Sequence, residues 1–95
     1  MLKITIRQSA RSTTFALEGR LCGQWAAEAR SAWTKLASNG HEKAIVLDLE
    51  GLTFLDQEGE ACLASMLESE TEVRAGGVLI RHVIRELRQK MARAR

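Results

Sequence analysis

The sequence lacks several features that would point to particular kinds of protein. Its 95 residues include no proline, no tyrosine and no low-complexity linker, and they leave room for one hydrophobic core. We therefore expect a single domain over residues 1–95. The longest apolar runs, such as Ala44–Leu47, are far shorter than the roughly 20 residues of a membrane span. Polar residues near the start, Lys3 and Thr5 among them, interrupt the apolar core of any signal peptide, which predicts a cytoplasmic protein.

Groups that could carry out catalysis are also few. Cys22 and Cys62 are 40 residues apart and form no metal-binding pair of the CxxC type. His41 and His82 accompany no serine or cysteine in a nucleophile-elbow context, and they have no HxxxH or HExxH spacing. The glycines do not form a phosphate-binding loop pattern. These absences predict a protein without enzymatic activity, cofactor, metal ion or small-molecule substrate.

The charged residues are unevenly distributed, although the net charge is only +2. Residues 41–72 contain nine acidic residues against Lys43, whereas residues 81–95 contain six basic residues against Glu86. The basic end leaves nucleic-acid binding through the C-terminal helix as an alternative function. That alternative is disfavoured because no aromatic residue follows Phe54, so there is no platform on which bases could stack. The sequence also contains no recognisable DNA-binding motif.

Hydrophobic periodicity predicts four strands. Residues Leu2–Ile6 alternate between apolar and polar side chains, and a second strand is expected at Thr13–Leu17, ending at Glu18-Gly19. The nearly continuous apolar run Lys43–Leu49 predicts a central strand covered by helices on both faces. A short fourth strand is expected at Thr71–Arg74.

Three helices are predicted between and after these strands. The first begins near Cys22 and stops at Ser38-Asn39-Gly40, where asparagine and glycine tolerate the left-handed cap conformation. The second follows Asp56, a candidate N-cap, and runs to about Ser69, and the third begins at about Val78. The order β-β-α-β-α-β-α predicts a small α/β fold with a mixed four-stranded sheet and three main helices.

Two motifs in the middle of the chain resemble the STAS family. Ala44-Ile-Val-Leu-Asp-Leu-Glu-Gly51 is similar to a family strand that ends in a hydrophobic residue followed by Asp-Leu-Ser-Gly. Phe54-Leu-Asp-Gln-Glu-Gly59 is similar to the family's Phe-hydrophobic-Asp-Ser-Ser-Gly segment, which precedes a helix. The similarity covers Leu17 to about Leu67 and also includes Leu2–Ile6, and between the second and the last helix the chain is shorter than is usual for the family.

This resemblance implies a STAS-like fold and a protein partner. In the anti-sigma-factor antagonists of the family, the unphosphorylated protein binds an anti-sigma factor that is also a serine kinase. Phosphorylation of the second serine of Asp-Ser-Ser-Gly ends the interaction, because a phosphate adds about −1.5 to −2 charge at the docking surface. The resemblance also implies an alternative, a non-switching STAS subunit of a transport or stress-signalling complex.

Neither serine of that motif is present in this chain. Glu58 stands where the phosphorylated serine is expected, so the loop cannot be phosphorylated there, and the nearby hydroxyls are Thr53 and Ser65. Glu58 either holds the module in a state resembling the phosphorylated one or belongs to a branch that binds without a switch. It can also be interpreted simply as a residue of the first helical turn. We predict that the partner, such as an anti-sigma factor kinase, binds the following helix and the residues at its start: Asp56, Gln57, Glu58, Gly59 and Glu60.

Overall fold

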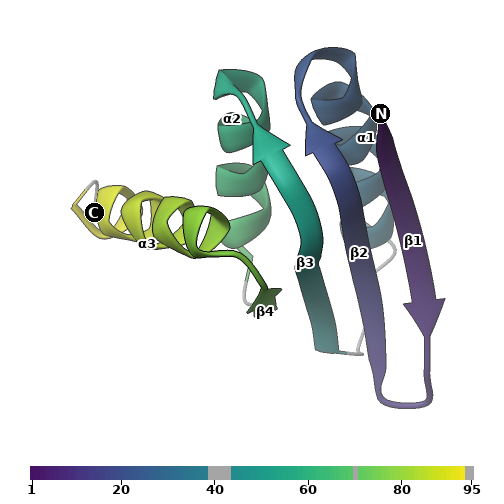
Figure 1. Ribbon diagram of the computed structural model, residues 1–95. Coiled ribbons are helices and arrows are strands. Elements are labelled where there is room, and N and C mark those ends of the chain that lie inside the picture. Colours follow the sequence, from purple (N-terminus) through teal and green to yellow (C-terminus); the bar gives the residue numbers. More distant parts are fainter. Residues whose placement is uncertain (39–43, 70, 94–95) are drawn as a thin grey trace.

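The computed structural model describes residues 1–38, 44–69 and 71–93 and contains the predicted elements in the predicted order. The strands form one mixed sheet in the order β1-β2-β3-β4, with β1 and β2 antiparallel and the other neighbours parallel (Figure 1). The predicted α/β fold class is confirmed. The elements are β1 (Leu2–Gln8), β2 (Ser12–Leu21), α1 (Gly23–Ser38), β3 (Ala44–Leu55), α2 (Gln57–Leu67), β4 (Glu72–Ala75) and α3 (Val78–Arg93).

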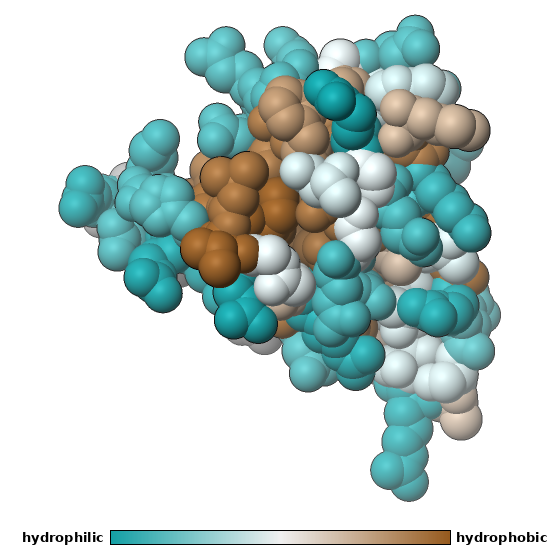
Figure 2. Space-filling model, in the orientation of Figure 1, coloured by the Kyte–Doolittle hydropathy of each residue, from teal (hydrophilic) through white to brown (hydrophobic). Residues whose placement is uncertain are grey.

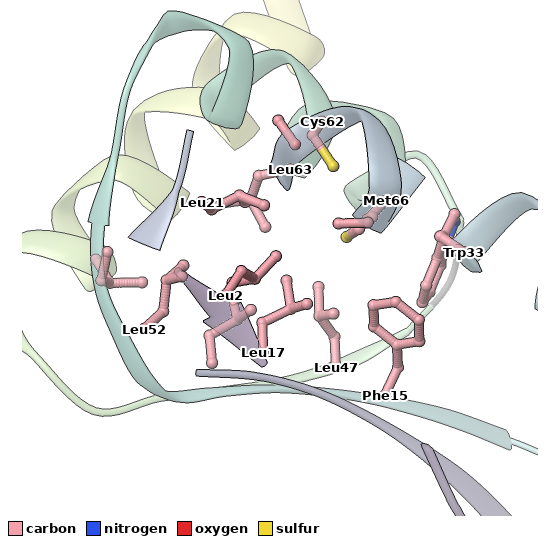
Figure 3. Close-up of a cluster of buried hydrophobic side chains, with 14 of the residues drawn as sticks. Leu2, Phe15, Leu17, Leu21, Trp33, Leu47, Leu52, Cys62, Leu63 and Met66 are labelled. Carbon is pink, nitrogen blue, oxygen red and sulfur yellow. The ribbon is translucent and has the colours of Figure 1, made fainter. Parts of the chain in front are cut away.

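Strand β3 lies between β2 and β4, as predicted, but helices cover only one of its faces. Leu47 and Leu49 join the buried residues of all three helices in one hydrophobic cluster, and Figure 3 shows strand side chains pointing toward the helices. On the opposite face, the Oδ2 of Asp48 lies 3.6 Å from the Nη2 of Arg7 of β1, which forms a salt bridge. Val46 is buried but lies outside the cluster. The prediction of two covered faces was therefore wrong, because Asp48 makes the second face polar.

Strands β2 and β3 extend beyond their predicted ends. Gly19, read as the end of a strand, lies within β2 in the left-handed region (φ 100°), where a side chain would collide with the Met1 carbonyl oxygen. The β2–β3 pairing shifts register on both sides of this glycine and continues to Leu21 and Leu55. Gly19 therefore marks an irregularity in the strand rather than its end.

Helix α1 packs on the sheet through an aromatic contact. Trp33 of α1 and Phe15 of β2 meet edge to face, with ring centroids 5.3 Å apart and planes inclined by 84°. Both side chains are buried, whereas Trp25 is only half-buried. The helix ends at Ser38, and the rest of the predicted stop signal lies outside the described residues, as does His41.

Helix α3 is amphipathic and extends away from the sheet beyond β4 (Figure 1). Ile80 and Ile84 are buried in the core, while Val78 and Leu79 are exposed at its first turn. Figure 2 shows a hydrophobic patch where α3 begins and hydrophilic residues over the rest of the helix. Among the helices of the described ranges, none combines the length and the apolar character that crossing a bilayer requires.

Candidate docking site at the start of helix α2

Asp56 connects the N-termini of two helices. It is the N-cap of α2, with an extended backbone, and its Oδ1 accepts a hydrogen bond from the Gly59 amide at 2.8 Å. Its Oδ2 accepts a hydrogen bond from the amide of Gly23, the first residue of α1, at 3.2 Å. The predicted N-cap is confirmed. The carboxylate also satisfies an amide of α1, so it fixes the two helix N-termini next to each other.

Gly59 is buried where α2 meets the end of β2. A Cβ at this position would collide with the carbonyl oxygen of Leu21 and would lie 2.8 Å from the Cβ of Leu55. The same Leu21 carbonyl accepts a hydrogen bond from the Asp56 amide at 3.4 Å. A glycine is therefore required for this close approach, and Gly59 acts on the fold rather than on a partner.

The other three predicted site residues differ in their exposure. Gln57 and Glu58 are exposed in the first turn of α2, and Glu60 is half-buried. Both acidic residues lie near the positive end of the helix dipole, which stabilises their charges. All five predicted residues thus lie together at one helix start, with Asp56 and Gly59 holding the turn and Gln57 and Glu58 facing solvent.

A shallow hollow lies beside Glu58, between α2 and α1. Its volume is about 270 Å³, slightly below the range of typical small-molecule pockets. The α1 residues here could not be identified from the sequence, because they precede Glu58 by about 30 residues and their pattern indicates only an amphipathic helix. They are Gly23, Ala26, Ala27, Arg30 and Ser31.

The groups near this site are poorly suited to catalysis. Burial raises the pKa of the Cys62 thiol on α2, and the Arg30 guanidinium only partly opposes this effect. A buried thiol that stays protonated is a weak nucleophile. His82 lies outside this site. It is exposed on α3, with its Nε2 3.9 Å from the Oε1 of Glu86. Within residues 1–38, 44–69 and 71–93, no three His, Cys, Asp or Glu side chains are placed to hold a metal ion.

Comparison with known proteins decides the family. The family model of the STAS domain matches residues 3–95. The chain belongs to the STAS family. Its fold is similar to that of the anti-sigma factor antagonist SpoIIAA in its unphosphorylated form, with a TM-score of 0.56 and 18% identity over 70% of this chain. It is also similar to the native form of Mglu, with a TM-score of 0.57 and 16% identity over 77% of this chain.

The likeness of this STAS domain to those structures concerns the fold alone. The chain spans 61% of SpoIIAA and 22% of native Mglu. Mglu in the presence of 4.3 M NaCl gives a TM-score of 0.55 at 13% identity, over 77% of this chain and 26% of that one. A sequence search among curated proteins found no match.

The two hydrogen bonds of Asp56 predict a measurable contribution to stability. Asp56→Ala removes the N-cap of α2 and the acceptor for the Gly23 amide, and we expect it to lower the free energy of unfolding by about 1–2 kcal/mol. Gln57→Ala, one residue further along and exposed, should change it by less than about 0.5 kcal/mol. Urea denaturation of the purified variants measures both values. Equal effects of the two substitutions would contradict the bridging role of Asp56.

Proposed function

We propose that this STAS domain is a non-catalytic interaction module, resembling an anti-sigma-factor antagonist, that binds a protein partner through the start of α2. The observation that carries the proposal is that the four residues of Asp56–Gly59 have different roles in the structure. The two residues that match the family motif, Asp56 and Gly59, are engaged within the fold, while the two between them are exposed. Surface residues held on a rigid helix start suit recognition, because their positions are fixed before the partner arrives.

The neighbouring hollow supports docking of a protein rather than a metabolite. Glu58 of α2 and Arg30 of α1 both line it, so the hollow has one acidic and one basic lining residue. A hollow of about 270 Å³ accommodates one or two partner side chains. Arginine is also enriched at protein interfaces relative to the rest of the surface. The docking surface therefore comprises Gln57, Glu58 and Glu60 of α2 together with Ala27, Arg30 and Ser31 of α1.

Glu58 gives this surface a permanent negative charge. Residues 56–59 contain no hydroxyl group, so a serine kinase has no acceptor there. A carboxylate carries a smaller charge and fewer oxygens than a phosphate, and the N-terminal end of α2 stabilises it. The module consequently binds its partner without the phosphorylation switch of the antagonists that carry Asp-Ser-Ser-Gly.

Charge reversal at the surface tests this function. The partner to use is the anti-sigma factor kinase of the same organism, because this is the class that the family resemblance implies. Glu58→Lys and Glu60→Lys should each weaken its binding, and the double variant should weaken it at least about tenfold, measured by isothermal titration calorimetry. Glu86→Lys on α3 is the matched control, since it makes the same charge change at an exposed position outside this surface. If Glu58→Lys and Glu60→Lys each bind the partner as tightly as Glu86→Lys does, this surface does not take part in partner binding.

A kinase assay tests the fixed charge separately. On incubation with that kinase and ATP, the unmodified chain should incorporate no phosphate, whereas Glu58→Ser should be phosphorylated at the new hydroxyl. Mass spectrometry of the tryptic peptides locates any phosphate. Phosphate on Thr53 or Ser65 of the unmodified chain would show that a switch persists at a neighbouring hydroxyl.

A further inference from the structure

A second candidate surface is a groove of about 750 Å³ between β4 and α3. Val73, Arg74 and Ala75 of β4 line it, together with Glu50 of β3 and one stripe of α3. Strand β4 is the last of the sheet order, so its outer edge is paired with no other strand of the described residues.

The groove is strongly basic. Arg81, Arg85 and Arg88 line it from α3, and their spacing of four and then three residues places them on one stripe of the helix. With Arg74 they make four basic lining residues, and Glu50 is the single acidic residue in the lining. In the part of the chain that the structure describes, none of these arginines lies within ion-pair distance of a carboxylate. Their mutual repulsion is relieved when an acidic ligand binds.

The groove also offers apolar contacts and a backbone edge. Val73, Ala75, Ile84 and Ala92 supply apolar surface between the arginines. The Nε of Arg81 donates a hydrogen bond to the Ala75 carbonyl at 3.1 Å, which holds the start of α3 beside the end of β4. Mixed apolar and basic walls beside an open strand edge suit an extended peptide with alternating acidic and apolar side chains.

We propose that this groove binds an extended acidic segment of a partner protein, which adds to β4 as a fifth strand. Main-chain hydrogen bonds to β4 hold the segment, its carboxylates meet the arginines of α3, and its apolar side chains cover Val73 and Ala75. This surface is separate from the start of α2 and does not depend on that site.

A nucleic acid suits the groove less well than an acidic peptide. The aromatic residues Phe15, Trp25, Trp33 and Phe54 lie outside its lining, so bases have no ring on which to stack. The apolar contacts and the strand edge would also remain unused by a phosphate backbone. The experiment must therefore distinguish peptide binding from nucleic-acid binding.

The test uses a fluorescein-labelled synthetic octapeptide of alternating glutamate and valine, with fluorescence anisotropy in about 50 mM salt, where charge pairing is weakly screened. We expect binding that weakens with added salt. A peptide with lysine in place of glutamate should not bind. A peptide with two of its valines replaced by proline should bind at least about tenfold more weakly, because proline lacks the amide hydrogen that strand addition needs.

Two double variants of α3 locate the site. Arg85→Glu with Arg88→Glu should weaken peptide binding at least about tenfold. Lys90→Glu with Arg93→Glu makes the same charge change on exposed residues outside the groove, and it should weaken binding by less than about threefold. Circular dichroism confirms that both variants are folded. Hydrogen exchange should show that the peptide slows exchange of the Val73–Ala75 amides.

Several results would overturn the proposal. These are absence of peptide binding, equal losses in the two double variants, and equal binding of the proline-containing peptide. Displacement of the peptide by an equimolar single-stranded oligonucleotide would identify the groove as a nucleic-acid site instead. Sedimentation velocity that shows a dimer abolished by Arg85→Glu with Arg88→Glu would identify a second copy of this chain as the occupant.

Discussion

Gly59→Ala is expected to lower the free energy of unfolding by about 3 kcal/mol. Elsewhere in a helix, replacing glycine by alanine stabilises a protein by up to about 1 kcal/mol, because alanine has the higher helix propensity. At residue 59 the new methyl group would collide with the Leu21 carbonyl oxygen, which belongs to backbone and cannot rotate away. Helix α2 would have to move away from the end of β2. The steric cost therefore exceeds the gain in propensity, and the sign of the effect is reversed.

Urea denaturation measures this loss, and Gly77→Ala is the matched control. No atom lies within 4 Å of the position that a Cβ at Gly77 would occupy, so the same substitution there should cost less than about 1 kcal/mol. A displaced α2 would also carry Gln57 and Glu58 with it. We therefore expect Gly59→Ala to weaken partner binding even under conditions in which the variant remains folded. Stabilisation by Gly59→Ala would show that α2 does not approach β2 this closely.

Trp33→Ala is expected to cost about 3–5 kcal/mol, a large part of the 5–15 kcal/mol that typically separates folded from unfolded domains. Trp33 is 4% exposed, and its ring meets that of the fully buried Phe15. Removal of the indole leaves a cavity between α1 and the sheet that neighbouring side chains fill only in part. Trp25→Ala on the same helix removes a half-buried indole and should cost only about 1–2 kcal/mol.

A double-mutant cycle isolates the contact between the two rings. Trp33→Leu and Phe15→Leu each retain an apolar side chain, so the variants are expected to remain folded. The coupling free energy between the two substitutions should be about 1 kcal/mol, in accord with an edge-to-face aromatic pair. Urea denaturation of the two single variants and the double variant gives this value. Additive effects would show that the rings stabilise the fold only through their burial.

The strand boundaries show where sequence reasoning was limited. Glu18-Gly19 and Gly51 have the composition of turns, so one strand was expected to end at Glu18-Gly19 and the next at Leu49, before Gly51. In the structure β2 and β3 continue through both glycines, because Glu18 pairs with Gly51 and Gly19 pairs with Leu52. The side chain of Glu18 occupies the space above Gly51, where a Cβ would lie 2.6 Å from its Cγ. A glycine in an irregular strand and a glycine in a turn look alike until the pairing partner is known.

The sequence by itself determined the order of the elements, the family motif and the N-cap at Asp56. These features depend on hydrophobic periodicity and on hydrogen bonds between residues a few positions apart. It also determined that residues 56–59 carry no hydroxyl group. For these reasons the first turn of α2 is identifiable as the candidate site from the sequence.

Only the tertiary structure decided which residues of that site contact the rest of the fold and which are exposed to solvent. Asp56 contacts Gly23, 33 residues earlier, and Gly59 lies against Leu21, so neither role is visible in the local sequence. The sequence likewise shows only that the C-terminal helix is basic. The tertiary structure places its arginines in one groove with β4, the last strand of the sheet. The physical reason is the same in each case, since packing between elements brings together residues whose separation along the chain carries no periodic signal.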